Sequence, residues 1–185
     1  MIVSESIIKK YEFMLSSKKF LILLKEKGYD FDLHEHKALF TVNDSNKLRG
    51  QIKGSHSKNL FLKNKKNKFY LISCEEFTDI NLKKFSKSLG LGNISFAKEE
   101  YLIKLLGIKP GSVTPFGLLN NNENTIDFYL EDKLLNSEYV NFHPLTNTAT
   151  VTMKSGKFIE FMIENNKKIH IFSLTEEVVI KTYGQ

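Results

Sequence analysis

Apolar residues recur near helical spacing close to the N-terminus, which predicts an amphipathic helix from about Ser6 to Lys27 that ends at Gly28. The next segment, Phe31 to His36, alternates apolar and polar residues and is typical of a short strand. In it, Phe31, Leu33 and Glu35 are expected on one face and Asp32, His34 and His36 on the other. Thr41 is a candidate N-cap for a short helix through Leu48.

Two apolar runs flank a lysine-rich segment in the middle of the first half. Residues 59–62 and 69–72 are strong strand candidates, and Lys63 to Lys68 between them contains no apolar residue. This pattern predicts a β-hairpin. A solvated turn is the favoured interpretation of the lysine-rich segment, and a contact surface is the second.

Further along, Asp79 is expected to cap a helix that carries Leu82, Phe85 and Leu89 and stops at Gly90. A second short helix, 101–106, is expected to stop at Gly107, because Pro110 follows soon after. Residues 109–117 then form a loop punctuated by glycine and proline. The last predicted elements are strands at 126–130, 140–142, 148–153 and 169–172, and a helix from Ser155 to Met162.

Helices and strands follow one another irregularly, with hairpins and no repeating strand–helix–strand order. This favours an α+β fold over a doubly wound sheet. No long polar linker interrupts the 185 residues, so we expect one domain, 1–185, with residues 1–28 as an N-terminal helix packed on it.

Composition narrows the class of protein. The chain is 41% hydrophobic and 26% charged, as in an ordinary soluble domain, and its single cysteine, Cys74, excludes an internal disulfide. No apolar run approaches the length of a membrane helix, and none suits a secretory signal. We therefore expect a soluble cytoplasmic protein with no membrane partner.

The formal net charge is +6, and all but one of the 27 basic residues are lysines, the exception being Arg49. Lysine suits attraction to phosphates better than reading of base edges, which is typical of arginine. A polyanionic partner is one interpretation. The lysine and asparagine bias of AT-rich genomes is the other.

The common catalytic signatures are absent from the sequence: there is no nucleophile elbow, phosphate-binding loop, dinucleotide fingerprint or zinc-protease helix motif. His34 and His36 have a spacing that can hold a metal, but no further Cys/His cluster lies nearby, so exposed polar positions are the favoured interpretation. Cys74 ends an apolar strand and is expected to be a small buried residue with no catalytic role. No metal or cofactor is expected.

Two segments carry polar residues at places where a pocket can form. One delivers Lys58 and Asn59 onto an apolar strand after Gly54, and a half-buried ammonium there is an effective partner for an anion or oxyanion. The other, residues 141–150, crowds polar side chains between two strands. From these residues alone, an exposed lysine at a strand end and ordinary turn chemistry remain the simpler explanations.

Three stretches in this order, GSHSKNLFLKNKKNKFYL, SFAKEEYLIKLLGIKPGSVTPFGLLN and YVNFHPLTNTATV, closely resemble the YbaK/ProX family of aminoacyl-tRNA editing domains. The likeness is greatest to the branch associated with prolyl-tRNA synthetase, the free-standing Ala-tRNA(Pro) deacylases. HEHKALFTVNDSNKLRGQIKG is similar to the family's usual segment before its lysine. The resemblance runs from about Phe31 to Ile171.

The resemblance implies a single compact α+β domain built on a mixed, partly open β-barrel flanked by helices. It also implies hydrolysis of the ester between a wrong amino acid and the 3′ end of tRNA. Lys58 matches the residue most closely tied to activity and is the expected catalytic residue. The expected substrate-binding residues, matched in the same way, are Asn59, Gly111, Ser112, Val113, Thr114, Pro115, His143 and Asn147. Ser57 departs from the threonine common in relatives, which is a conservative change.

The implied substrate is tRNA(Pro) mischarged with alanine, and prolyl-tRNA synthetase is a possible partner; no DNA partner is implied. Cys-tRNA(Pro) is an alternative substrate. A non-catalytic module that binds tRNA or a synthetase, and a generic soluble α+β domain with lysine bias, are the alternatives outside this activity.

Overall fold

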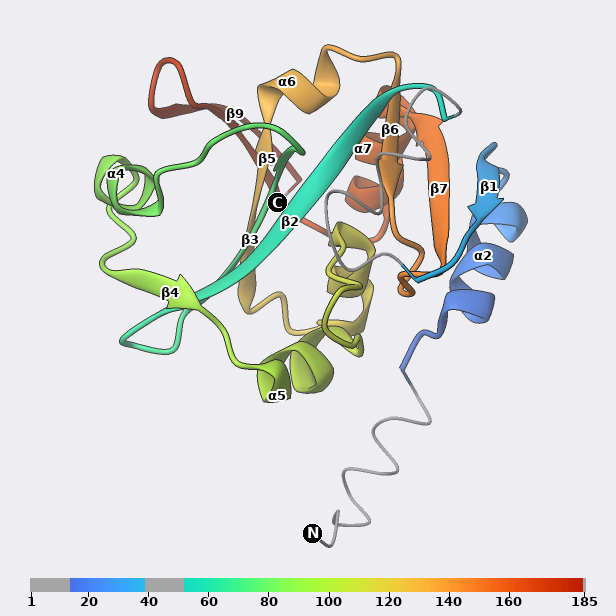
Figure 1. The fold of residues 1–185 in the computed structure, drawn as a ribbon, viewed down its shortest axis with the longest axis horizontal. Coiled ribbons are helices and arrows are strands. Elements are labelled where there is room, and N and C mark those ends of the chain that lie inside the picture. The colour runs from blue at the N-terminus through green and yellow to red at the C-terminus, as the bar shows by residue number, and fades with distance from the viewer. Residues whose placement is uncertain (1–13, 39–51, 185) are drawn as a thin grey trace, which may run out of the picture.

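A computed structural model describes residues 14–38 and 52–184 of the chain. Its strands form one connected nine-stranded sheet, in the order β1-β7-β6-β2-β3-β5-β8-β9, with β4 paired to β2 (Figure 1). The strands are β1 (Asp32–Glu35), β2 (Ser55–Asn64), β3 (Phe69–Glu75), β4 (Ile94–Phe96), β5 (Ile126–Glu131), β6 (Tyr139–Phe142), β7 (Ala149–Lys154), β8 (Ile169–Ser173) and β9 (Val178–Tyr183). The helices are α2 (Ser17–Glu26), α4 (Leu82–Ser88), α5 (Glu99–Tyr101), the π-helical turn η1 (Leu102–Leu106), the 3₁₀ helix η2 (Pro115–Asn120), α6 (Asp132–Leu135) and α7 (Ser155–Glu164).

β2 is the longest strand, and its two edges are paired differently. One edge pairs with β3 in an antiparallel hairpin from Ser57 to Lys63. On the other edge, the start of β2 pairs in parallel with β6, and its end pairs with β4. Between these contacts, residues 57–60 have no strand partner on that edge within the described chain. The sheet is therefore mixed and partly open, as the family resemblance implies, and it opens beside Lys58.

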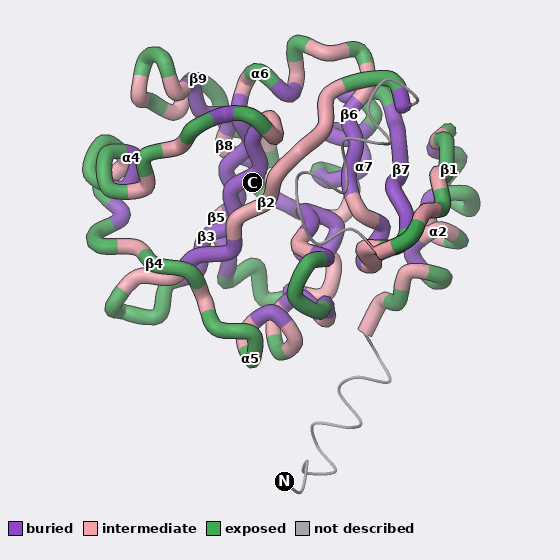
Figure 2. The backbone as a smooth tube through the Cα atoms, in the orientation of Figure 1, coloured by how far each residue is buried: buried purple, intermediate pink, exposed green. Residues whose placement is uncertain are grey.

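The two faces of the β2–β3 hairpin bury different clusters, because successive side chains of a strand point to opposite sides. Phe61 and Leu71 enter the main core, which α2, α7, η1 and η2 cover. Leu62 and Tyr70 enter a smaller core beneath α4. β3 and β5 are accordingly almost entirely buried, β2 is mostly half-buried, and the hairpin turn and the outer side of α4 are exposed (Figure 2). Within the described chain, no helix is long and apolar enough to cross a membrane.

Most predicted elements are confirmed, including the hairpin, the helix at 155–162 and the strands near 126–130, 140–142, 148–153 and 169–172. Gly28 and Gly107 follow α2 and η1 as expected. β8 is not the last strand of the sheet, however, because the largely exposed edge strand β9 follows it in the sequence and pairs with it. β4 and α6 were not predicted, because each has four residues or fewer.

Two helix starts differ from the prediction. α2 begins at Ser17, since the Ser16 side chain accepts a hydrogen bond from the Lys19 amide and caps it; residues 6–13 lie outside the described chain. α4 is capped by Asn81 and not by Asp79, because Asn81 stands three residues before the Lys84 amide that it accepts from. The predicted helix at 41–48 also lies outside the described residues.

The β1 strand is confirmed, but the expectation that its histidines are exposed is wrong. Leu33 is 40% exposed, whereas His34 and His36 are half-buried. His34 pairs with Thr150 of β7, and the neighbouring pair joins Asp32 to the buried Thr152. The histidine face of β1 thus continues a buried polar face of β7, so these histidines are not exposed polar positions.

Candidate functional site

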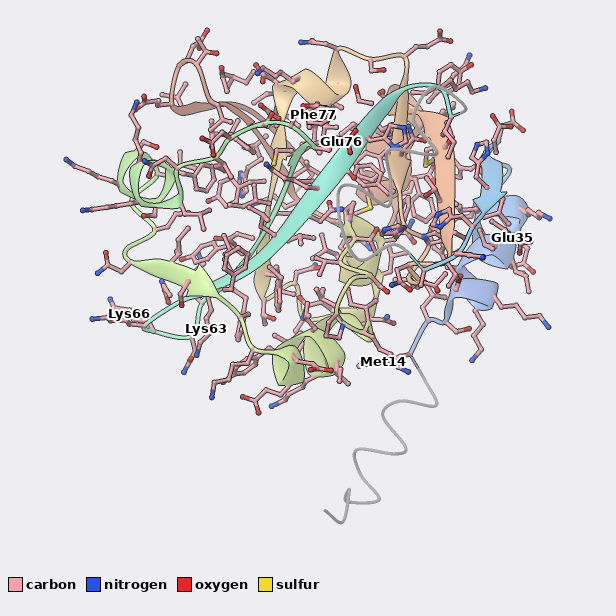
Figure 3. The ribbon with its side chains drawn as sticks, viewed as in Figure 1. Met14, Glu35, Lys63, Lys66, Glu76 and Phe77 are labelled. Carbon is pink, nitrogen blue, oxygen red and sulfur yellow. The ribbon has the colours of Figure 1, made fainter. Side chains whose placement is uncertain are left out.

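Lys58 lies on β2 directly opposite Cys74 of β3 and is half-buried. Its ammonium donates a hydrogen bond to the backbone carbonyl oxygen of Thr78. Thr78 comes close because the chain turns back after β3, where the Glu76 amide donates to the His56 carbonyl oxygen at 3.0 Å. Figure 3 shows Glu76 and Phe77 beside the first half of β2. Lys58 is therefore held in place, and the interpretation of an exposed strand-end lysine is wrong.

The residue that holds Lys58 is itself fixed by a buried carboxylate. Glu131, at the end of β5, is fully buried and accepts hydrogen bonds from the Thr78 hydroxyl at 2.9 Å and the Glu75 amide at 2.8 Å. The Lys133 ammonium lies 4.0 Å from its other oxygen. Sequence reasoning missed this network, since Thr78 and Glu131 are 53 positions apart and neither belongs to a recognisable motif.

Cys74 is fully buried, as expected. Burial raises the pKa of its thiol to about 12, even though the nearby Lys58 charge acts in the opposite direction. Its thiol contacts the Lys58 carbonyl oxygen at 3.9 Å. Cys74 is thus a neutral packing group behind Lys58, and it is unsuited to act as a nucleophile.

Asn59 follows Lys58 on an extended strand, so the two side chains point to opposite faces of the sheet. The side-chain oxygen of Asn59 accepts a hydrogen bond from the Ser73 hydroxyl, and the side-chain nitrogen of Asn59 donates one to the Ser57 hydroxyl at 3.3 Å. Ser57 in turn donates to the backbone carbonyl of Asn141 on β6 at 2.8 Å. Asn59 therefore links β3 to β6 across the open edge of β2.

His143 follows β6 and is tied to the start of β7. Its Nδ1 lies 2.8 Å from the Ala149 carbonyl oxygen, which can only accept, so Nδ1 carries the proton in this contact. Burial lowers the pKa of the imidazole, and the neighbouring His36 contributes in the same direction. A neutral His143 presents its Nε2 lone pair as an acceptor. Asn147 is half-buried in the turn between the two strands.

His36 joins this group and was not among the residues expected at the site. Its ring lies 6.1 Å from the ring of His143, centroid to centroid, and its Nε2 lies 3.0 Å from the Thr150 hydroxyl. The signal in the sequence is the His34–His36 spacing, which by itself suggests only a possible metal site. Within the residues that the structure describes, no three His, Cys, Asp or Glu side chains are grouped so as to hold a metal ion.

The glycine–proline loop is fixed by its own backbone and by the main core. Gly111 has φ 82°, a conformation that favours glycine, and the Ser112 amide donates to the Lys109 carbonyl at 3.1 Å. Thr114 caps η2 through a contact of 3.4 Å to the Phe116 amide. Ser112, Thr114 and Pro115 are buried, Val113 is half-buried, and Gly111 is exposed.

β6 is the element that gathers the predicted segments. Ser57 bonds to Asn141, the Phe116 ring packs edge-on against Phe142 with centroids 5.8 Å apart, and His143 comes next. The strand that Lys58 occupies and the helix that follows the loop thus both reach β6. Among the described residues, no hydrogen bond joins the Lys58 ammonium to the loop or to His143.

Comparison with known proteins decides the family. The model of the aminoacyl-tRNA editing domain matches residues 36–161, which span the chain from the end of β1 into α7. The chain belongs to the aminoacyl-tRNA editing domain family. The resemblance to the YbaK/ProX family is thereby confirmed, and all the predicted site residues lie inside the matched span.

The relatives of this editing-domain chain carry names that refer to prolyl-tRNA or to its synthetase. It is 37% identical over 133 residues to the prolyl-tRNA synthetase associated domain-containing protein 1 of Bos taurus, covering 69% of this chain and 77% of the relative. It is 31% identical over 144 residues to the prolyl-tRNA editing protein ProX of Acetoanaerobium sticklandii, covering 77% and 87%. A crystal structure described as a candidate trans-editing enzyme for prolyl tRNA synthetase shares the fold, with a TM-score of 0.63, 21% identity and coverage of 84% and 96%.

Proposed function

We propose that this chain is a trans-editing hydrolase that removes alanine from mischarged tRNA(Pro), with Lys58 as its catalytic residue. Membership of the editing-domain family and the ProX relative support the reaction class. The observation that carries the proposal for Lys58 is its half-buried ammonium, anchored to Thr78 beside the open edge of β2.

The reaction needs no strong protein nucleophile, because an aminoacyl ester is already activated. A water oxygen attacks the ester carbonyl carbon, the bond to the ribose oxygen breaks, and that oxygen leaves with a proton. Negative charge develops on the carbonyl oxygen, and a fixed cation in a partly desolvated site stabilises it strongly. Lys58 supplies that cation, or it holds the 3′-terminal nucleotide in the orientation for attack.

The other residues would position the substrate. The exposed backbone at Gly111 and the loop through Pro115 would orient the ester, while Asn59 and Asn147 would hold the surrounding strands and turn. His143 would accept a hydrogen bond through Nε2 from the substrate's ammonium, a ribose hydroxyl or the water. The neighbouring ribose 2′-hydroxyl is a suitable proton donor or acceptor, which makes the reaction partly substrate-assisted.

Size selection explains why such an enzyme is needed. A missing methylene changes binding by only about 1–3 kcal/mol, so a synthetase cannot strongly reject a smaller amino acid. A second site that admits alanine and excludes the bulkier proline supplies the remaining discrimination. Cysteine is also small, and Cys-tRNA(Pro) is the alternative substrate. The alternative outside catalysis is a module that binds tRNA or the synthetase without hydrolysing the ester.

A deacylation assay tests this function. tRNA(Pro) charged with Ala, Cys, Ser or Pro is incubated with the native chain, with Lys58→Ala and with Lys58→Met, which keeps the aliphatic stem. Lys154→Ala, at an exposed lysine, is the control. We expect fastest loss of alanine, no loss of proline, and no turnover by folded Lys58 variants. Unchanged rates in these variants would remove Lys58 from the mechanism, and tRNA binding without any hydrolysis would favour the non-catalytic module.

A further inference from the structure

The lysine-rich turn between β2 and β3 forms one wall of a groove at the edge of the molecule. The opposite wall is the segment that follows α4, around Gly90 and Gly92, and the space between them is about 560 Å³. Lys65, Lys66 and Lys68 line it from the turn, and Asn93 lines it from the other wall. Figure 3 shows Lys63 and Lys66 at this outer end of the hairpin.

The charge of the groove is one-sided. Lys65, Lys66 and Lys68 supply the positive charge from the turn, and the opposite wall, residues 89–93, contains no charged residue. Asp127 also lines the groove, but its carboxylate pairs with the Lys68 ammonium at 2.7 Å. Lys65 and Lys66 are exposed, and within the described chain they pair with no carboxylate. The free charge of the groove is therefore positive.

The two walls are held together before any ligand arrives. The Asn64 side-chain oxygen accepts from the Lys66 and Lys68 amides at 2.9 and 3.0 Å, which fixes the turn. The Asn64 amide group donates across the groove's base to the Leu91 carbonyl at 3.1 Å, and the Tyr70 hydroxyl reaches the same oxygen at 3.4 Å. A preformed cationic groove loses little conformational entropy when it binds.

The groove lies at the far end of the strand that carries Lys58. Lys58 and Asn64 are six residues apart on β2, which corresponds to about 20 Å at the rise of an extended strand. An aminoacyl ester at the 3′ end of a tRNA is likewise separated from the paired stem by a few unpaired nucleotides. One strand therefore places a phosphate-binding surface at a suitable distance from the candidate catalytic lysine.

We propose that this groove binds backbone phosphates of the tRNA stem while the 3′ ester lies at Lys58. The inference rests on the proposed function and adds the surface that receives the RNA. Lysine ammonium groups act as point charges on phosphates, which provides attachment and orientation with little reading of sequence. The partner is thus the sugar–phosphate backbone of the stem and not particular base pairs.

The test compares two double variants of equal net charge. Lys65→Gln/Lys66→Gln removes the free charges of the groove, and Lys18→Gln/Lys19→Gln removes two exposed lysines of α2. Binding of uncharged tRNA(Pro) is measured by fluorescence anisotropy from low to moderate salt. We expect the groove variant to bind roughly tenfold more weakly at low salt and to lose about 1–2 from the slope of log K against log salt. The α2 variant should match the native chain.

Deacylation kinetics provide the second readout. The groove variant should show a higher KM with little change in kcat, since it loses binding that is equal in the ground and transition states. Equal salt slopes for both double variants would overturn the proposal and attribute binding to overall charge. Because uncharged tRNA is used for binding, absence of hydrolysis in the native chain would reject the proposed function without touching the groove result.

Discussion

Lys58 and Glu131 are joined through one intervening residue, Thr78. The Thr78 carbonyl oxygen accepts from the Lys58 ammonium, while its hydroxyl donates to the fully buried Glu131 carboxylate. The position of the candidate catalytic cation thus depends on a buried anion that the substrate does not need to contact. Lys58 is on β2 and Glu131 ends β5, so the contact spans β3, which lies between these strands in the sheet.

Removing the Thr78 hydroxyl should therefore loosen Lys58. In Thr78→Val, the Glu131 carboxylate loses a hydrogen bond in a buried site, which should lower the free energy of unfolding by about 1–3 kcal/mol. Deacylation should show a lower kcat with a nearly unchanged KM, because Thr78 positions Lys58 and does not contact substrate. Urea unfolding and steady-state kinetics measure the two effects.

Thr78→Ser is the matched control, because it keeps the hydroxyl and removes only a methyl group. It should restore most of the stability and of kcat. If the serine variant were as inactive as the valine variant, the hydroxyl would have no part in positioning Lys58.

Cys74 provides a probe of the same strand pair. Its thiol is fully buried and burial raises its pKa to about 12, so both access and ionisation oppose reaction. We expect a thiol reagent such as DTNB to label the native chain only at the rate of opening of β2 from β3, and to label one thiol at once in denaturant. Rapid labelling of the folded protein at neutral pH would contradict the buried position.

The lowered pKa of His143 predicts how the free energy of unfolding depends on pH. Its folded-state pKa lies below the ordinary histidine value because of burial, so the unfolded chain binds the proton more readily. The free energy of unfolding should therefore fall as pH drops from about 6.5 through the lowered folded pKa, and this loss should be smaller in His143→Gln. Urea titrations at several pH values measure the free energy of unfolding, and NMR follows the titration of the His143 imidazole.

Activity should follow the same protonation. If the neutral Nε2 accepts a hydrogen bond from the substrate or water, deacylation declines below the folded pKa of His143. A His143 titration midpoint at or above the ordinary histidine value would contradict the assignment. His36 is the nearby titratable ring and is followed in the same spectra.

The sequence allowed the fold to be predicted where periodicity is strong. The β2–β3 hairpin alternates apolar positions around a turn of lysines and asparagines, and the structure forms it with the expected pairing. Element ends were less predictable, since Asn81 and Asp79 are equally good caps in sequence and only the distance to the Lys84 amide distinguishes them. Which face of β1 is buried depends on β7, and β7 is more than a hundred residues away in sequence.

The site was predictable in its parts and not in its connections. Lys58 and His143 came from motif resemblance, and the structure gives both a half-buried setting with defined hydrogen bonds. Thr78 and Glu131 carry no local pattern, and their roles arise only because the chain turns back after β3. Asn59 was expected beside Lys58, but strand alternation places its side chain on the other face.

The start of β2 depends on a glycine, which yields a prediction for the whole site. Gly54 has φ 87°, and a Cβ there would lie 2.4 Å from the backbone oxygen of Tyr139 on β6. Gly54→Ala must therefore separate β2 from β6, because backbone atoms cannot move aside as a flexible side chain can. Gly28→Ala is the control: Gly28, just after α2, has a similar φ of 73° but no atom within 4 Å of the added Cβ.

Both variants strain the backbone by about 1 kcal/mol or more, since alanine disfavours positive φ. Only Gly54→Ala should add a steric cost, disturb the Ser57–Asn141 contact and lower deacylation together with stability. Thermal unfolding and hydrogen exchange at the β2–β6 amides separate the two effects. Equal stability of the alanine variants would mean that the close approach of Gly54 to Tyr139 does not hold the edge of β2, and that the opening beside Lys58 is maintained by other contacts.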